Sequence, residues 1–330
     1  MSLHKKHLCL LLGLSATPAL ALAQSLADAF PSKPVTLIQA ATPGGSADIV
    51  MRLYAKKITE NTKWNMLLDY KPGAGGVIGF NQVAKAIPDG HTILMINSPF
   101  TTTAATVRNL PYDPVADFAP VYMTSKATSV LFVHPSLPIN SVKDYVAYAK
   151  ANPGKINYGT SGTGSISHLS AVWLNQLAGI NVTFIPFKGT TEARVAILSG
   201  EIQATNGTLL GAIQDVKAGK VRPIGTLDAS QRSPLLPDVP TIAEQGYPSY
   251  SHLSWAGVTA PAKVPGAIIA KLNAEYIKAA FAPEVVETLA KGGEENGGRM
   301  TPEQFKERTT NEINRWRKVV RDAGLTVQDL

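Results

Sequence analysis

Residues 35–58 read VTLIQAATPGGSADIVMRLYAKKI, and this stretch predicts a strand, a glycine-rich loop and a helix in direct succession. The apolar run 35–40 is typical of a buried strand. It ends at Thr42-Pro43-Gly44-Gly45-Ser46, after which apolar residues recur with the helical period at Ile49, Val50, Leu53, Tyr54 and Ile58. A strand that passes through a short loop into a helix is the building unit of α/β folds.

The same alternation continues along the chain. Further strands are expected at 66–70, 91–96, 156–158 and 182–187, and helices at 79–86, 141–150, 167–178 and 190–200. Two strand-like segments within 118–133 flank Thr124-Ser125-Lys126. The pattern predicts mostly parallel sheets flanked by helices. A chain of 330 residues is long enough for two such domains.

Three glycine- and hydroxyl-rich loops, at 42–48, 97–103 and 159–168, follow predicted strands and lead into helices. In parallel α/β sheets ligands bind beyond the carboxyl ends of the strands, which is where these loops lie. The first N–H groups of a helix lack internal partners and sit at the positive end of the helix dipole, so they favour anions. Because none of the loops contains Arg, the sequence predicts a carboxylate held by backbone amides and hydroxyls.

A simpler interpretation of these loops is helix capping. Ser46, Asp48, Ser165 and Ser167 are residue types that prefer helix starts, and Asp48 also complements the helix dipole. Capping and ligand binding are compatible, and three such loops in one chain favour binding.

Other chemistries find less support in the sequence. His168 with Ser161 or Ser165 could suggest a serine hydrolase, but residues 159–163 depart from G-x-S-x-G at the final position. The glycines at 73–79 are spaced one residue too widely for a dinucleotide loop. The six histidines show no metal-ligand spacing. We therefore expect no catalysis, metal or cofactor.

The N-terminus predicts export. Basic residues 4–7 precede the apolar run 8–14, and Ala21-Leu22-Ala23 forms an A-x-A cleavage site, so residues 1–23 are expected to be a signal peptide. The alternative, a membrane anchor, would need a longer apolar run. The single cysteine, Cys9, lies in this peptide. The formal charge of +7 comes from scattered Lys and Arg, which disfavours nucleic acid and mildly favours anionic solutes.

A series of short motifs, in order along nearly the whole mature chain, resembles the Bug-type extracytoplasmic receptors, the substrate-binding subunits of tripartite tricarboxylate transporters. The motifs are Pro31-Ser32-Lys33-Pro34-Val35, Pro43-Gly44-Gly45-Ser46-Ala47-Asp48, Lys71-Pro72-Gly73-Ala74-Gly75-Gly76, Pro88-Asp89-Gly90, Leu110-Pro111-Tyr112-Asp113-Pro114, Asp117-Phe118-Ala119-Pro120, 158–168, Pro186-Phe187-Lys188-Gly189, Lys217-Ala218-Gly219-Lys220, Arg232-Ser233-Pro234, Pro237-Asp238-Val239-Pro240-Thr241 and Trp255-Ala256-Gly257. Each motif is weak alone, but their order and spacing together are specific.

The resemblance implies a periplasmic solute-binding protein with two lobes and the ligand between them, each lobe a mostly parallel sheet flanked by helices. It implies that residues 24–124 and 252–330 form lobe 1, that 125–251 form lobe 2, and that helix 311–320 packs on lobe 1. The implied ligand-binding residues are Gly45, Ser46, Ala47, Asp48, Ser98, Thr101, Ser161, Thr163, Gly164, Ser165, His168, Phe187, Lys188, Asn206, Gly207 and Thr208.

The resemblance also implies the kind of ligand and partner. Ligands of the family are mostly carboxylates, and membrane transporter subunits are its partners, although a sensor kinase could take their place. We expect a monomer. Many relatives have an acidic residue followed by Asn where this chain has Gly207-Thr208. Since an ammonium group needs acceptors, we expect an organic acid without an amino group. Its apolar body, if present, is expected near Phe100, Phe187 or Trp255.

Overall fold

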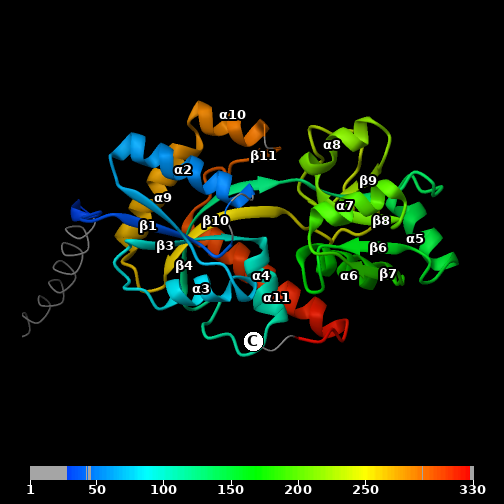
Figure 1. The fold of residues 1–330 in the computed structure, drawn as a ribbon, viewed down its shortest axis with the longest axis horizontal. Coiled ribbons are helices and arrows are strands. Elements are labelled where there is room, and N and C mark those ends of the chain that lie inside the picture. The colour runs from blue at the N-terminus through cyan, green and yellow to red at the C-terminus, as the bar shows by residue number, and fades with distance from the viewer. Residues whose placement is uncertain (1–27, 42, 44–45, 292, 328–330) are drawn as a thin grey trace, which may run out of the picture.

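A computed structural model describes residues 28–327 except 42, 44–45 and 292. The expected signal peptide therefore lies outside the described residues. The chain forms two α/β lobes side by side along the long axis of the molecule (Figure 1), which confirms the predicted two-lobed architecture. No described helix is both long and apolar enough to cross a membrane.

The first lobe is built on a six-stranded sheet in the order β11-β4-β10-β3-β1-β2. Its strands are β1 (Val35–Gln39), β2 (Met66–Tyr70), β3 (Thr92–Asn97), β4 (Phe118–Ala127), β10 (Ser254–Pro261) and β11 (Glu294–Glu295). Its helical segments are α2 (Ser46–Thr62), η1 (Ala74–Gly76), α3 (Val77–Ala84), α4 (Ser98–Thr106), α9 (Gly266–Ala280), α10 (Pro283–Lys291) and α11 (Pro302–Asp322).

The second lobe is built on a five-stranded sheet in the order β7-β6-β8-β5-β9. Its strands are β5 (Ser129–Val133), β6 (Asn157–Thr160), β7 (Thr183–Pro186), β8 (Ala204–Thr208) and β9 (Arg222–Thr226). Its helices are α5 (Val142–Ala151), α6 (Ile166–Ala178), α7 (Thr190–Ser199) and α8 (Leu209–Lys217).

Both sheets are mixed. The strands predicted from the βα alternation pair in parallel, β1 with β2 and β3, and β6 with β7 and β8. The strands that connect the lobes pair antiparallel: β10 with β3 and β4, and β5 with β8 and β9. Parallel pairing is therefore confined to the strands that point their carboxyl ends toward the other lobe.

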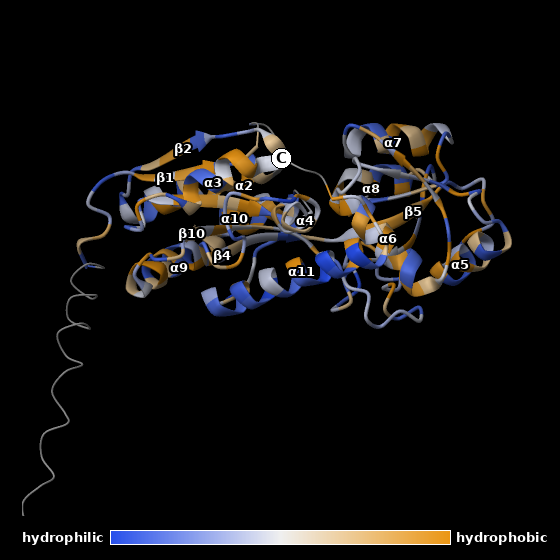
Figure 2. Cartoon of the chain, turned by 90° about the horizontal axis from the view of Figure 1, so that it is seen from below, coloured by the Kyte–Doolittle hydropathy of each residue, from blue (hydrophilic) through white to orange (hydrophobic). Residues whose placement is uncertain are grey.

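Each sheet is covered on both faces. In the first lobe α2, α9 and α10 bury their apolar sides on one face, while α3, α4 and α11 cover the other. In the second lobe α5 and α6 cover one face and α7 and α8 the other. Figure 2 shows the apolar strands gathered in two bodies, with the largely hydrophilic α11 reaching from the first lobe toward α6 of the second.

A small apolar cluster joins the lobes. Ala105 of α4, Leu169 and Val172 of α6, and Trp316 of α11 are all buried in it. We propose that the lobes divide near residues 124 and 251, because β4 and β10 lie where the chain passes between the two sheets.

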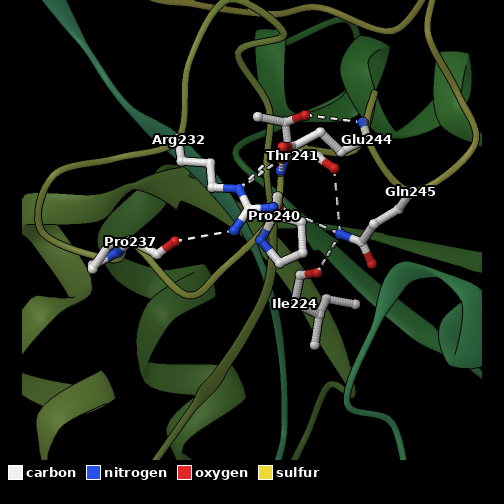
Figure 3. A network of polar contacts seen from close by, with 7 residues as sticks. All are labelled: Ile224, Arg232, Pro237, Pro240, Thr241, Glu244 and Gln245. Carbon is white, nitrogen blue, oxygen red and sulfur yellow. Dashed lines mark hydrogen bonds and ion pairs between the residues drawn. The ribbon is translucent and has the colours of Figure 1, made fainter.

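The chain returns from β9 to β10 through a long segment without regular structure, and a polar network holds it (Figure 3). Arg232 donates from Nε to both carboxylate oxygens of Glu244 at 3.0 and 3.1 Å, and from Nη1 to the Pro237 carbonyl. Gln245 donates to the Ile224 carbonyl on β9 at 2.9 Å. The motifs at 232–234 and 237–241 therefore serve to fasten this crossing.

Candidate ligand-binding site

The carboxyl ends of β1 and β3 in one lobe, and of β6, β7 and β8 in the other, face the space between the lobes. Each of these strands is followed by a helix whose N-terminus points into the same space: α2, α4, α6, α7 and α8 (Figure 1). A cleft of about 550 Å³ opens here between α4 and η1 of lobe 1 and the loop before α6 of lobe 2.

The loop before α6 carries a connected chain of three serine hydroxyls. Ser167 Oγ lies 2.9 Å from Ser161 Oγ and 3.0 Å from Ser165 Oγ, and it also accepts a 2.8 Å hydrogen bond from the Ser161 N–H. Ser165 caps α6 by accepting from the His168 N–H at 3.3 Å. Ser161, Thr163, Gly164 and Ser165 line the cleft, whereas Ser167 is buried behind them. The hydroxyls are thus held in place for a partner in the cleft.

The side chain of His168 holds this loop in place. Its Nδ1 accepts a 3.1 Å hydrogen bond from the Gly164 N–H, and its ring packs edge-on against Phe184 at 4.7 Å. Burial lowers the pKa of the imidazole below its ordinary value, because the charged form is poorly solvated there. Among the described contacts, neither Ser161 nor Ser165 hydrogen-bonds the His168 ring, whose Nδ1 is occupied by the Gly164 N–H.

The predicted residues of α4 face inward. Ser98 is 1% exposed, and its hydroxyl accepts from the backbone N–H of Trp255 at 3.0 Å. Thr101 is fully buried and donates to Glu312 Oε1 at 3.0 Å. The indole N–H groups of Trp255 and Trp316 also donate to this carboxylate, so Glu312 is satisfied by three neutral donors. The side chain of Ser98 therefore anchors α4 to β10, and that of Thr101 anchors it to α11, while their neighbours Pro99, Thr102 and Thr103 line the cleft.

In the loop before α2, Gly45 lies outside the described residues. Ala47 lines a second pocket of about 410 Å³, at the end of β1. Asp48 is buried, and its Oδ1 accepts from Arg52 at 3.0 Å and from the Tyr70 hydroxyl at 2.6 Å. The Asp48 carboxylate is thus committed to its own lobe.

The lobe 2 residues of the predicted site are dispersed. Lys188 is exposed and donates its N–H to Glu192 at 3.1 Å, and Phe187 is half-buried. Asn206 is buried, and its amide donates to the Ser167 carbonyl at 3.2 Å and to Ser170 Oγ at 2.8 Å. Asn206, Gly207 and Thr208 line a separate pocket between α7 and α8, together with Thr190 and Arg194.

Two of the three aromatic residues expected beside the ligand are in the core instead. Phe100 is 2% exposed and packs edge-on between Phe80 and Phe118. Trp255 is 3% exposed and packs against Phe305. Large apolar rings lower the free energy of folding most when fully buried, and both take that role here.

Two residues outside the predicted set of ligand-binding side chains lie at the cleft loop and at the second pocket. Ser167 connects the hydroxyls of the cleft loop, and the sequence signal for it was a third serine after two others. Gln39 lines the second pocket, and the signal for it was an amide side chain directly after the apolar residues Leu37 and Ile38 of the strand. The described residues contain no cluster of His, Cys, Asp or Glu that could hold a metal ion.

Comparison with known proteins bears on this site. Residues 50–325 match the family described as the tripartite tricarboxylate transporter family receptor. Protein BugT of Bordetella pertussis is 32% identical over 300 residues, which cover 90% of this chain and 91% of BugT. The structure of Rhodopseudomonas palustris Rpa4515 with adipate is 32% identical, with a TM-score of 0.74, and covers 91% of this chain and all of its own. That of MatC from the same organism with bound malate is 30% identical, with a TM-score of 0.72, and covers 88% of this chain and all of its own.

Proposed function

The chain belongs to the tripartite tricarboxylate transporter receptor family, and we propose from this that it captures a small organic carboxylate in the cleft between its lobes. The serine chain at 161–167 is the observation that carries the proposal. Its hydroxyls line a cleft at the start of α6, where the helix dipole favours negative charge.

The way the carboxylate is held follows from these contacts. Ser161 and Ser165 each bridge to Ser167, which leaves their remaining hydrogen-bonding capacity directed to the cleft. A neutral His168 keeps Gly164 in place without adding charge. Because no Lys or Arg is among the described residues that line this cleft, the anion is held by dipoles and neutral donors. Such a site releases its ligand readily.

The relatives support a carboxylate ligand. Rpa4515 was seen with adipate and MatC with malate. Neither of those ligands carries an amino group, and we propose the same of the solute bound here. The Asn206 amide is hydrogen-bonded to Ser167 and Ser170. The Asp48 carboxylate is bonded to Arg52 and Tyr70, so it is not dedicated to an ammonium group of the ligand.

We further propose that the protein works as a periplasmic monomer, exported by cleavage after Ala23 and delivering its solute to membrane subunits of a tripartite transporter. Delivery to a sensor kinase is the alternative, and deleting the cognate membrane subunits separates the two. Loss of uptake supports the transporter, whereas retained uptake with lost signalling supports the sensor.

The binding proposal is tested by native mass spectrometry of the purified protein, followed by calorimetry with adipate, malate and their amino counterparts, such as glutamate and aspartate. We expect one bound acid per chain, with its mass unchanged after incubation. Turnover of an ester or amide of such an acid would support the hydrolase alternative, and preferential binding of the amino acids would contradict the proposed ligand class.

Two serine variants separate binding from capping. Ser161→Ala removes a cleft hydroxyl that caps no helix, so we expect roughly 10- to 100-fold weaker binding with little change in melting temperature. Ser165→Ala removes the α6 cap as well, so we expect a further loss of about 1 kcal/mol in the free energy of unfolding. Unchanged affinity in both variants, measured by calorimetry, would leave the serines a purely structural role.

A further inference from the structure

We infer that the ligand extends from the serine loop, residues 161–167 at the start of α6, into the pocket at the end of β1. There Gln39 recognises a neutral hydrogen-bonding group on the far end of the ligand. The inference rests on the proposed function, since it assumes that a carboxylate is anchored at the serine loop. It narrows the ligand to a monocarboxylate with an apolar body and a terminal hydroxyl or carboxamide.

Gln39 is the first observation. It lies at the end of β1, between β3 and the edge strand β2, level with Tyr70 on β2 and Met95 on β3. Its side chain is 3% exposed, and its Oε1 has no hydrogen-bond partner among the described residues. A buried amide oxygen without a partner destabilises the folded protein, because it loses its water and gains nothing in return. Such a group is expected where its partner arrives with a ligand.

The pocket around Gln39 is the second observation. Three alanines, at 40, 41 and 47, form short walls and leave a space of about 410 Å³. Phe80 and Met95 add apolar surface, and Asn97 is the other polar side chain at the pocket. An apolar chamber with one or two placed polar groups is the usual form of a small-molecule site.

The pocket adjoins the cleft of the serine loop. Gly75 and Pro99 line both spaces and form the boundary between them. The Thr103 hydroxyl holds Gly75 in place by donating to its carbonyl at 3.3 Å. Gly75 has no side chain, and its φ of 62° suits glycine. A ligand held at Ser161 and Ser165 can therefore pass Gly75 and place its other end beside Gln39.

The chemistry of the pocket selects a neutral far end. In contrast to the serine cleft, its described lining residues include neither a cation nor a Ser or Thr hydroxyl, so a second carboxylate would lose water without gaining a counter-charge or hydroxyl donors. A hydroxyl both donates and accepts, and so it satisfies the Gln39 amide whichever way the amide is turned. The apolar walls suit methylenes or an aromatic ring between the two ends.

Three six-carbon acids test this directly: hexanoate, 6-hydroxyhexanoate and adipate share one chain and differ only at the far end. We expect the wild-type protein to bind 6-hydroxyhexanoate about tenfold more tightly than hexanoate, and more tightly than adipate, in calorimetry at neutral pH. In Gln39→Leu, the ratio between 6-hydroxyhexanoate and hexanoate should fall close to one.

Gln203→Leu is the matched control. Gln203 is an amide whose two ends have partners, the Asn157 N–H at 3.0 Å and the Gly200 carbonyl at 3.3 Å, within lobe 2. Its loss should lower the melting temperature and keep the ratio between the two acids. Gln39→Leu should melt at or above the wild-type temperature without ligand, because an unpartnered polar group is replaced by an apolar one.

The outcomes separate the two proposals. A ratio unchanged by Gln39→Leu, tighter binding of adipate than of 6-hydroxyhexanoate, or a melting temperature lowered as far as in Gln203→Leu would each overturn the role of Gln39 and leave carboxylate binding intact. If none of the three acids, nor benzoate or 4-hydroxybenzoate, binds at millimolar concentration, the proposed function fails with it.

Discussion

His252 lies where the chain returns to the first lobe, just before β10. Its backbone N–H donates to the Leu227 carbonyl at 2.7 Å, and its imidazole ring packs edge-on against Trp316. Burial, reinforced by the nearby guanidinium groups of Arg315 and Arg308, lowers the pKa of its imidazole to about 3. Since an unfolded histidine has a pKa of about 6.5, the folded state keeps this ring neutral across that whole interval.

We therefore expect acid to destabilise the protein through this residue. Between about pH 6.5 and pH 3 the unfolded chain binds a proton that the folded chain does not, so the stabilisation is complete above pH 6.5 and is lost as pH falls. His252→Phe should show a shallower decline in the free energy of unfolding, by up to about 1.4 kcal/mol per pH unit. Urea denaturation from pH 7 to pH 4 measures it, and parallel declines in both proteins would contradict the pKa.

Single residues also show where sequence reasoning about the site stops. The hydroxyls of Ser161 and Ser165 were recognisable because glycines, serines and a helix start occur together within a few residues. Thr101 was assigned to the ligand for the same reason, yet it donates to Glu312, 211 positions away. A local pattern shows that a hydroxyl is present but not which distant acceptor the fold brings to it.

At the scale of elements, local periodicity predicted the βα units well. The helix expected at 167–178 spans Ile166–Ala178 and ends at Gly179, whose φ of 60° favours glycine. The strands of the crossings were less predictable. Polar residues at 124–126 suggested a break, yet β4 continues to Ala127 because β10 pairs along it. Strand direction and partner depend on residues far along the chain, so a mostly parallel arrangement was expected where mixed sheets occur.

The docking of α11 on the first sheet depends on the absence of a side chain at Gly257. A Cβ at this position of β10 would overlap the Phe305 ring of α11 and lie 2.8 Å from the Tyr122 carbonyl oxygen. Because Phe305 is fully buried, it has little room to move. We expect Gly257→Ala to lower the free energy of unfolding by about 1–3 kcal/mol, the usual cost of overpacking a core.

Gly266→Ala is the matched control for this prediction. Gly266 begins α9, and a Cβ there would meet no atom of the described residues within 4 Å. The variant should be as stable as the wild type or slightly more so, since alanine favours helices. Thermal denaturation of the two variants compares them, and equal melting temperatures would show that α11 tolerates displacement from β10.

At the scale of the whole molecule, an aromatic junction joins α11 of the first lobe to α6 of the second. Arg315 of α11 lies between Trp316 on its own helix and Trp173 of α6, with its guanidinium 5.1 and 5.0 Å from the two rings. Trp173 also stacks on Tyr250 at 4.8 Å. On the cleft side a Cβ at Gly164 would meet Thr106, and away from this junction a Cβ at Gly293 would meet Leu210, so neither place leaves room for a side chain at the glycine. The junction combines cation–π and stacking contacts of large rings and is suited to act as a pivot.

Binding of the carboxylate is expected to close the lobes about this pivot, because a ligand that contacts both lobes favours the state in which both contacts form. Small-angle scattering of the wild-type protein should show a smaller radius of gyration at saturating ligand.

Trp173→Leu removes one face of the cation–π contact, worth about 1 kcal/mol, so its unliganded radius of gyration should exceed that of the wild type. Trp64→Leu is the control, since Trp64 packs against Phe30 within lobe 1 and should leave the radius unchanged. Identical profiles with and without ligand, and in both variants, would mean that the lobes move as one rigid body and that the solute enters without closure.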